Sequence, residues 1–191
     1  LIETLATGNL ARTGYQNVGG DLDLSMGMSL NSAGNKLIVA SFMNEKVLEF
    51  TVTGNNLTRV SVAGTRASSA NGSFYSPADA AYDSSGNIYV VERDNHRIQK
   101  LNSSLVYQAK KGSFKRNAAF YNPYGMTIDS SDNIYVADLS NQTIRKFNTS
   151  LTETATFGGQ SGTKLSGAKR VIKQIVSDTN LTAGANFGLM E

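Results

Sequence analysis

A segment that occurs twice at a fixed spacing constrains the fold of this chain more than any other feature. Residues 83–101 read DSSGNIYVVERDNHRIQKL, and residues 129–147 read DSSDNIYVADLSNQTIRKF, 46 residues further along. The two prolines of the chain, Pro77 and Pro123, keep the same spacing, and a looser copy of the segment lies at 31–50. A fixed period of this length indicates an array of one supersecondary unit. The repeat therefore determines the expected fold class.

Each repeat is expected to form four short antiparallel strands, a to d. In the second repeat they are predicted over 78–82, 88–92, 96–101 and 105–110, with Asp/Ser/Asn/Gly turns between them. Strand c alternates apolar with charged residues, which predicts that only one of its faces is buried. Four antiparallel strands in each ~45-residue repeat are typical of a β-propeller blade.

The repeat predicts an all-β propeller part over residues 1–159. Its three full blades are expected at about 24–64, 77–113 and 123–159. Residues 1–9 align with the end of the last repeat and are expected to be the outer strand of a preceding blade. Three blades cannot close a ring, and an open ring exposes apolar blade flanks. Further blades are therefore expected outside this sequence, with another chain as the alternative source.

The pattern F-x-x-P, an apolar strand, DSSGNIYV and then NHRIQK closely resembles the NHL repeat. The resemblance covers roughly residues 1–159 and implies a β-propeller, commonly of six blades in this family. Asp138 fits the V-A-D position of the family, where Glu92 stands in the second blade and Ser41 in the first. At this position the resemblance implies a carboxylate that braces the backbone of the next strand or a neighbouring arginine.

The period stops before residues 160–191. A glycine-rich linker precedes a predicted amphipathic helix over 163–178 and a predicted strand over 185–191. This pair resembles the first helix and second strand of an α/β von Willebrand A domain, as in the tip adhesins of bacterial type IV pili. The Asp-x-Ser-x-Ser metal motif of that domain is absent from this sequence. We expect no cofactor in the chain itself, and a divalent cation only if that motif lies upstream of Leu1.

Composition limits the chemistry that the chain can carry. It contains no cysteine and one histidine, His96, which excludes thiolate chemistry and a multi-histidine metal site within one chain. A net charge of +3 is too small to indicate nucleic acid binding. No apolar run approaches the ~18 residues of a membrane-spanning helix. Asp83 and Asp129 are expected to form turns, with weak calcium binding as the alternative.

Blade topology places a ligand site at one end of the blades. The b–c loops and the d–a connections emerge together, and the long segments 64–76 and 112–122 lie at that end, whereas short turns occupy the other end. Binding residues usually lie on loops that a rigid scaffold positions. The side chains expected to contact a ligand there are Arg66, Tyr75, Arg93, Lys115, Arg116 and Tyr121.

These patterns favour a non-enzymatic binding or structural module of a bacterial extracellular or pilus-associated adhesin. The expected partners are a protein or glycan ligand and other subunits of a surface appendage, rather than nucleic acid or a membrane. Two alternatives stay open. One is an NHL-type lyase whose missing blades supply metal ligands to the central channel, and the other is an RNA-binding NHL propeller.

Overall fold

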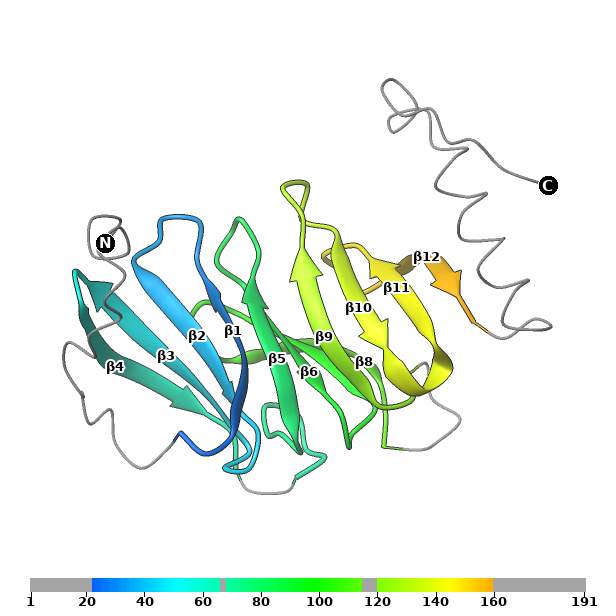
Figure 1. Ribbon diagram of the computed structural model, residues 1–191, viewed down its shortest axis with the longest axis horizontal. Helices are drawn as coiled ribbons and strands as arrows, with labels where there is room; N and C mark the ends of the chain where they lie inside the picture. Colours follow the sequence, from blue (N-terminus) through cyan, green and yellow to red (C-terminus); the bar gives the residue numbers. More distant parts are fainter. Residues whose placement is uncertain (1–21, 66–67, 115–119, 160–191) are drawn as a thin grey trace, which may run out of the picture.

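The structure, a computed structural model, describes residues 22–65, 68–114 and 120–159. These residues form three four-stranded antiparallel sheets that stand side by side as propeller-like blades (Figure 1). The predicted strand at 1–9 and the predicted helix and strand of 160–191 lie outside the described residues.

Every blade uses its four strands in the order of the sequence. The first blade comprises β1 (Ser25–Leu30), β2 (Lys36–Ser41), β3 (Lys46–Thr53) and β4 (Asn56–Ala63). The second comprises β5 (Pro77–Tyr82), β6 (Ile88–Glu92), β7 (Arg97–Leu101) and β8 (Tyr107–Gly112). The third comprises β9 (Pro123–Ile128), β10 (Ile134–Asp138), β11 (Thr143–Phe147) and β12 (Glu153–Gly158), with the 3₁₀ turn η1 (Leu139–Asn141) after β10.

The first strands of the three blades, β1, β5 and β9, lie beside one another along the inner side of the array (Figure 1). Each is an edge strand of its sheet, because only its own second strand pairs with it. Strand β8 begins at Tyr107, later than predicted, since Leu105 adopts a left-handed φ of 61° and belongs to the preceding turn.

Two hydrophobic clusters join the blades, and they use equivalent positions of the repeat. The equivalent side chains are Ile38, Ala40, Val47 and Phe74 between the first two blades, and Tyr89, Val91, Ile98 and Phe120 between the last two. Phe74 and Phe120, the phenylalanines of F-x-x-P, are fully buried. The motif therefore supplies the contact that seats one blade on the blade before it.

The outer flank of the third blade presents the same positions, and no blade packs on it within residues 22–65, 68–114 and 120–159. Tyr135, Ala137 and Ile144 are the repeat equivalents of the buried residues Tyr89, Val91 and Ile98. Ile144 is 50% exposed, whereas Ile98 is fully buried. The flank is thus an apolar surface of the kind that is covered at both joints between blades.

The prediction that strand c of the second blade is half-buried is wrong. Arg97 and Gln99 of β7 are buried together with Ile98. One face of β7 packs toward the third blade, and the other lies under the segment before β5. Polar side chains are tolerated on that second face because backbone carbonyls accept their hydrogen bonds.

The first residue of every a–b turn organises the turn. Asn31, Asp83 and Asp129 each accept hydrogen bonds from backbone N–H groups of their own turn through Oδ1. Tyr89 and Tyr135 donate their hydroxyls to Oδ2 of Asp83 and Asp129, respectively. Both aspartates are therefore turn formers, as the sequence predicted. The described parts of the chain contain no group of three His, Cys, Asp or Glu residues that could hold a metal ion.

Asp132 links the turns of the second and third blades. Its carboxylate accepts hydrogen bonds from the Ser84 backbone N–H at 2.8 Å and from the Ser84 hydroxyl at 2.6 Å. Asp132 has a φ of 60°, at the position that Gly86 occupies in the second blade. Aspartate tolerates this left-handed region better than most residues, so the third blade gains a contact to its neighbour that glycine cannot make.

The close approach of β1 to β5 gives the first testable prediction. A Cβ atom on Gly27 would lie 2.5 Å from the Asp79 Cα, whereas a Cβ on Gly125, the equivalent residue of β9, would meet nothing within 4 Å. We expect Gly27→Ala to lower the free energy of unfolding by about 1–3 kcal/mol, because the strands must move apart. Gly125→Ala is the matched control and should change it little. Urea unfolding checks both variants, and equal losses would contradict this packing.

The turn of the third blade predicts part of the pH dependence of stability. Hydrogen bonds from the side chain and backbone of Asn133 lower the pKa of Asp129 to about 2. An unfolded aspartate titrates near about 3.9, so the carboxylate stabilises the fold above that pH and loses this contribution as the pH falls toward 2. Asp129→Asn keeps the acceptor that Asn31 provides in the first blade.

We expect the Asp129→Asn variant to lose less stability than the parent between pH 5 and pH 2. Unfolding midpoints measured at several pH values over this window provide the check. An unchanged pH profile would mean that the Asp129 carboxylate does not contribute.

Candidate ligand-binding face

The loop end of the blades carries the predicted contact residues that the structure describes. Tyr75 precedes β5, Arg93 follows β6 and Tyr121 precedes β9. These loops lie along the lower edge of the array in Figure 1. The other predicted contacts, Arg66, Lys115 and Arg116, lie outside the described residues.

Glu92, the last residue of β6, is fully buried at the centre of this end. Its Oε2 accepts hydrogen bonds from the Tyr75 backbone N–H at 3.0 Å and from the Asn95 amide at 2.6 Å. Its Oε1 accepts from Arg97 Nε at 2.6 Å and from Gln99 Nε2 at 2.8 Å. Burial raises the pKa of Glu92, and the Arg97 guanidinium opposes that rise. The carboxylate is thus a buried anion with one cation and several donors.

Arg97 and Gln99 use their remaining donors to hold the segment before β5. Arg97 donates to the carbonyl oxygens of Ser69 at 2.7 Å, Ala70 at 3.0 Å and Ser73 at 2.9 Å. Gln99 also donates to the Ser73 carbonyl at 2.9 Å. A segment without regular secondary structure is therefore fixed by side chains of β7. The sequence signal for this network was the polar alternation of NHRIQK, which predicted an exposed strand face instead.

The other blades repeat the central contact of this network with different acceptors. Asp138 accepts from the Tyr121 backbone N–H at 2.7 Å and from the Asn141 amide at 2.8 Å. In the first blade the Ser41 hydroxyl accepts from the Asp23 backbone N–H at 2.9 Å. The NHL resemblance implied a brace at this position, and the structure shows one. It holds the segment that leads into the first strand of its own blade.

Arg93 is paired rather than free. Its Nε and Nη2 atoms donate to the two carboxylate oxygens of Asp94 at 2.8 and 2.9 Å, and Asp94 also accepts from the Ser76 hydroxyl at 2.6 Å. The guanidinium lies 4.7 Å from the ring centroid of Phe42 in the first blade. The Asp94 carboxylate raises the pKa of Arg93. The loop end therefore presents an ion pair stacked on an aromatic ring.

Tyr121 packs against the only histidine of the chain. The rings of Tyr121 and His96 meet edge to face with centroids 5.5 Å apart. His96 Nδ1 accepts a hydrogen bond from the Asn122 backbone N–H at 3.1 Å. His96 thereby joins the second blade to the third, which is a structural role.

The loop end also exposes apolar side chains that sequence reasoning did not select. They are Met43 in the first blade, Phe114 after the second and Leu139 in the third, which are 55%, 60% and 61% exposed. All three follow a strand that ends at this side of the array. These three side chains offer apolar contact area at the loop end.

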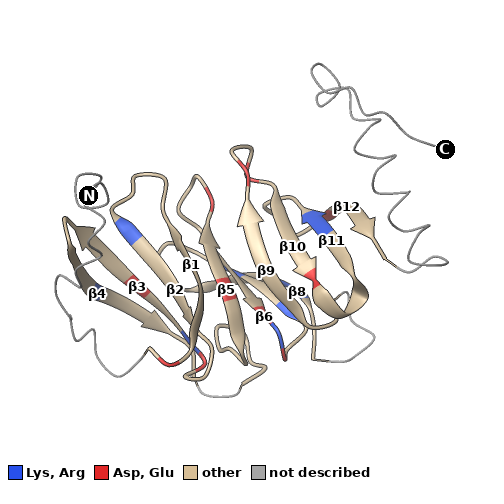
Figure 2. Ribbon diagram, viewed as in Figure 1, with Lys and Arg blue, Asp and Glu red and all other residues tan. Residues whose placement is uncertain are grey.

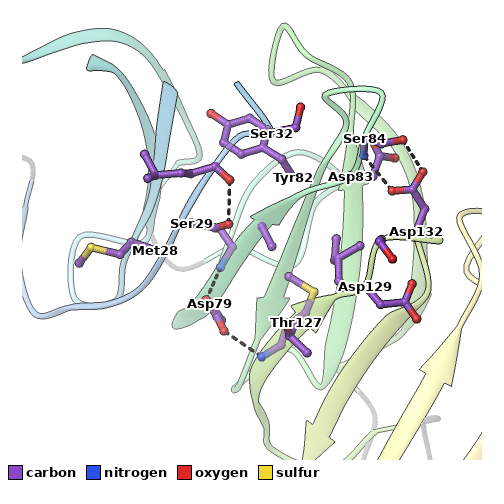
Figure 3. A pocket seen from close by; sticks show the side chains of 16 residues that line it. Met28, Ser29, Ser32, Asp79, Tyr82, Asp83, Ser84, Thr127, Asp129 and Asp132 are labelled. Carbon is purple, nitrogen blue, oxygen red and sulfur yellow. Dashed lines mark hydrogen bonds between the residues drawn. The ribbon is translucent and has the colours of Figure 1, made fainter. Parts of the chain in front are cut away.

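A cavity lies at the opposite end of the inner strands, beside the a–b turns. It measures about 390 Å³, and residues of β1, β5 and β9 line it (Figure 3). Figure 2 shows acidic residues in the two turns beside it, at the upper edge of the array. The predicted contact residues are not among those that line this cavity.

Comparison with known families supports the repeat. Residues 74–101 and 120–147 match the NHL repeat. Each match runs from the buried phenylalanine through strand c of one blade. The chain thus carries NHL repeats in propeller-like blades. No curated protein matches the sequence as a whole.

Solved structures share the fold at low sequence identity. A functionally unknown protein from Desulfotomaculum acetoxidans is 14% identical with a TM-score of 0.58, over 79% of this chain and 47% of its own. Virginiamycin B lyase from Staphylococcus aureus is 14% identical with a TM-score of 0.51, over 70% and 40%. A periplasmic gluconolactonase from Pseudomonas aeruginosa is 13% identical with a TM-score of 0.53, over 69% and 38%.

This chain spans less than half the length of each of these structures. At such identities the likeness shows the fold alone. Within the described residues, no helix has the length and hydrophobicity needed to cross a membrane.

The buried carboxylate gives the third prediction. Glu92→Gln leaves the Arg97 charge buried without an anion and turns an amide group toward N–H donors. We expect it to lower the free energy of unfolding by about 3–5 kcal/mol. Ser41→Ala, at the equivalent position of the first blade, removes a neutral acceptor and should cost about 1 kcal/mol.

Denaturant unfolding of the two variants tests this ranking, and limited proteolysis of the 68–76 segment tests its cause. Comparable losses for Glu92→Gln and Ser41→Ala would show that the carboxylate has no special role. Faster cleavage in Glu92→Gln alone would show that the network holds this segment.

Proposed function

We propose that this chain is a non-enzymatic binding module that holds a protein or glycan ligand on the loop end of its blades. The observation that carries the proposal is the buried network of Glu92, Arg97 and Gln99, which fixes the 68–76 segment and the backbone of Tyr75. A loop that is ordered before binding loses less conformational entropy when a ligand arrives.

The side chains on this face suit a ligand with apolar or ring surfaces. Met43, Phe114 and Leu139 expose apolar area at the loop end, and Tyr75 and Tyr121 are partly accessible at the same end. Tyrosine offers a large rigid contact surface at low entropic cost. This composition favours the faces of sugar rings or the apolar side chains of a protein.

The pairing of Arg93 supports this class of ligand over RNA. Asp94 already neutralises the guanidinium, so Arg93 is not available as a free phosphate contact. Phosphate contacts from unpaired Lys and Arg dominate affinity for nucleic acids. Placement of the module in a bacterial extracellular adhesin, with a von Willebrand A segment after residue 160, remains part of the proposal from the sequence.

Paired variants on the two ends of the blades test the proposal. We expect the full chain to bind probes on a glycan array or immobilised extracellular matrix proteins, and Tyr75→Ala with Tyr121→Ala to weaken that binding by about tenfold or more. Ser104→Ala, in an exposed turn at the opposite end, is the matched control and should bind like the parent.

Circular dichroism must show that the tyrosine variants keep their fold. A poly(U) RNA probe in low and in 150 mM salt belongs in the same screen. Salt-sensitive RNA binding without glycan or protein binding would overturn the proposal, as would an equal effect of Ser104→Ala.

A further inference from the structure

The cavity beside the a–b turns has the features of a second binding site, at the end of the blades opposite the proposed ligand face. It is bounded by the inner strands of all three blades (Figure 3). The residues that line it include Asp79 of β5, Ser29 of β1, and Met126 and Thr127 of β9. A volume of about 390 Å³ is large enough for a small ligand.

Asp79 is the one charged residue in β1, β5 and β9. Its Oδ1 accepts from the Ala80 backbone N–H at 2.8 Å, and its Oδ2 accepts from the Met126 backbone N–H at 2.8 Å. No ion pair in the described parts of the chain includes Asp79. Burial raises the pKa of this carboxyl. A partly desolvated carboxylate without a cation is most readily stabilised by one from a ligand.

The neighbouring strands indicate how much positive charge the cavity can accept. By strand register, Gly27 of β1 and Gly125 of β9 occupy the position of Asp79. At this position of the repeat, only β5 therefore has a carboxylate, and the other two inner strands have glycine. Calcium sites use six to eight oxygen ligands, often from several carboxylates. The acidic side chains at the rim, Asp83, Asp129 and Asp132, are engaged in turn contacts. A single carboxylate matches a monovalent cation better than a metal ion.

The remaining lining suits an ammonium group on an alkyl chain. Because β1, β5 and β9 are edge strands, carbonyl groups on their inner side have no strand partner. An ammonium group has three donors and no acceptor, so it can use the carboxylate together with hydroxyl or carbonyl oxygens. Met126, whose backbone N–H binds Asp79, has a flexible, polarisable side chain of a kind that packs well against methylene groups.

We propose that this cavity binds a primary alkylammonium group, held by Asp79 beside Met126 of β9. The group could belong to a free alkylamine or to a lysine side chain of a partner protein. Both present the same chemistry to the cavity.

Methyl NMR of the full chain with ¹³C-labelled methionine tests the proposal with n-butylamine as probe. We expect saturable shifts at Met126, and none at Met43, which lies at the loop end. n-Butanol, the uncharged control of similar shape, should produce no such shifts. Asp79→Asn should weaken amine binding by about tenfold or more, since it removes a charge-assisted contact.

Asp79→Asn also disturbs two backbone hydrogen bonds and could misfold. A second variant therefore leaves Asp79 and these hydrogen bonds in place. Ser29→Asp places a second carboxylate on β1, at a position that lines the cavity (Figure 3). It should tighten n-butylamine binding by about fivefold, because a second negative charge faces the cation. Equal binding of butanol and butylamine would overturn the proposal, as would amine binding that neither variant changes.

An acetylated peptide with one lysine distinguishes the two sources of the group. Shifts of Met126 with the peptide would assign the cavity to a lysine of a partner. Shifts with butylamine alone would assign it to a free amine. The absence of shifts with both probes would reject the site.

Discussion

A buried hydrogen-bond acceptor at the end of each b strand is the interaction on which the blades depend. Glu92, Asp138 and Ser41 occupy this place, and each accepts from the backbone that leads into the first strand of its blade. Burying a carboxylate without a partner would cost much of the free energy that stabilises the fold. In the second blade the cost is offset by Arg97, Asn95 and Gln99, which also order the connection from the blade before. Strand pairing within a blade and packing between blades are thus joined at one residue.

The departures from the repeat are as informative as the repeat itself. Asp132 replaces a turn glycine and binds Ser84 of the neighbouring blade. Asp79 stands where the other inner strands have glycine, and it binds Met126 of the neighbouring blade. Both substitutions place a carboxylate opposite a backbone N–H across a joint between blades. The repeat therefore specifies each blade, while single residues outside the pattern add contacts between particular neighbours.

Periodicity was sufficient to predict the four-stranded blades and the order of their strands. It was insufficient for β7, because alternation of polar and apolar residues indicates exposure only when the polar side chains face water. Arg97 and Gln99 face carbonyl groups of a segment that is distant in the sequence, and a pattern within one strand does not report such a partner.

The candidate sites were harder to predict for the same reason. Tyr75 and Tyr121 could be assigned to the loop end because blade topology fixes where the loops emerge. The pairing of Arg93 with Asp94 depends on side-chain geometry, and the cavity beside Asp79 depends on how three inner strands meet. No sequence pattern distinguishes exposed residues such as Leu139 from core residues.

The outer flank of the third blade gives the array a polarity. Tyr135, Ala137 and Ile144 repeat a surface that is twice matched by a buried phenylalanine from the following blade. Stacking of the described blades is therefore directional. A neighbour that fits this flank must offer an aromatic plug at the register of Phe120, which restricts the sequences able to continue the array. The contacts at the two described joints thus indicate which side chain a further neighbour would need to place on this flank.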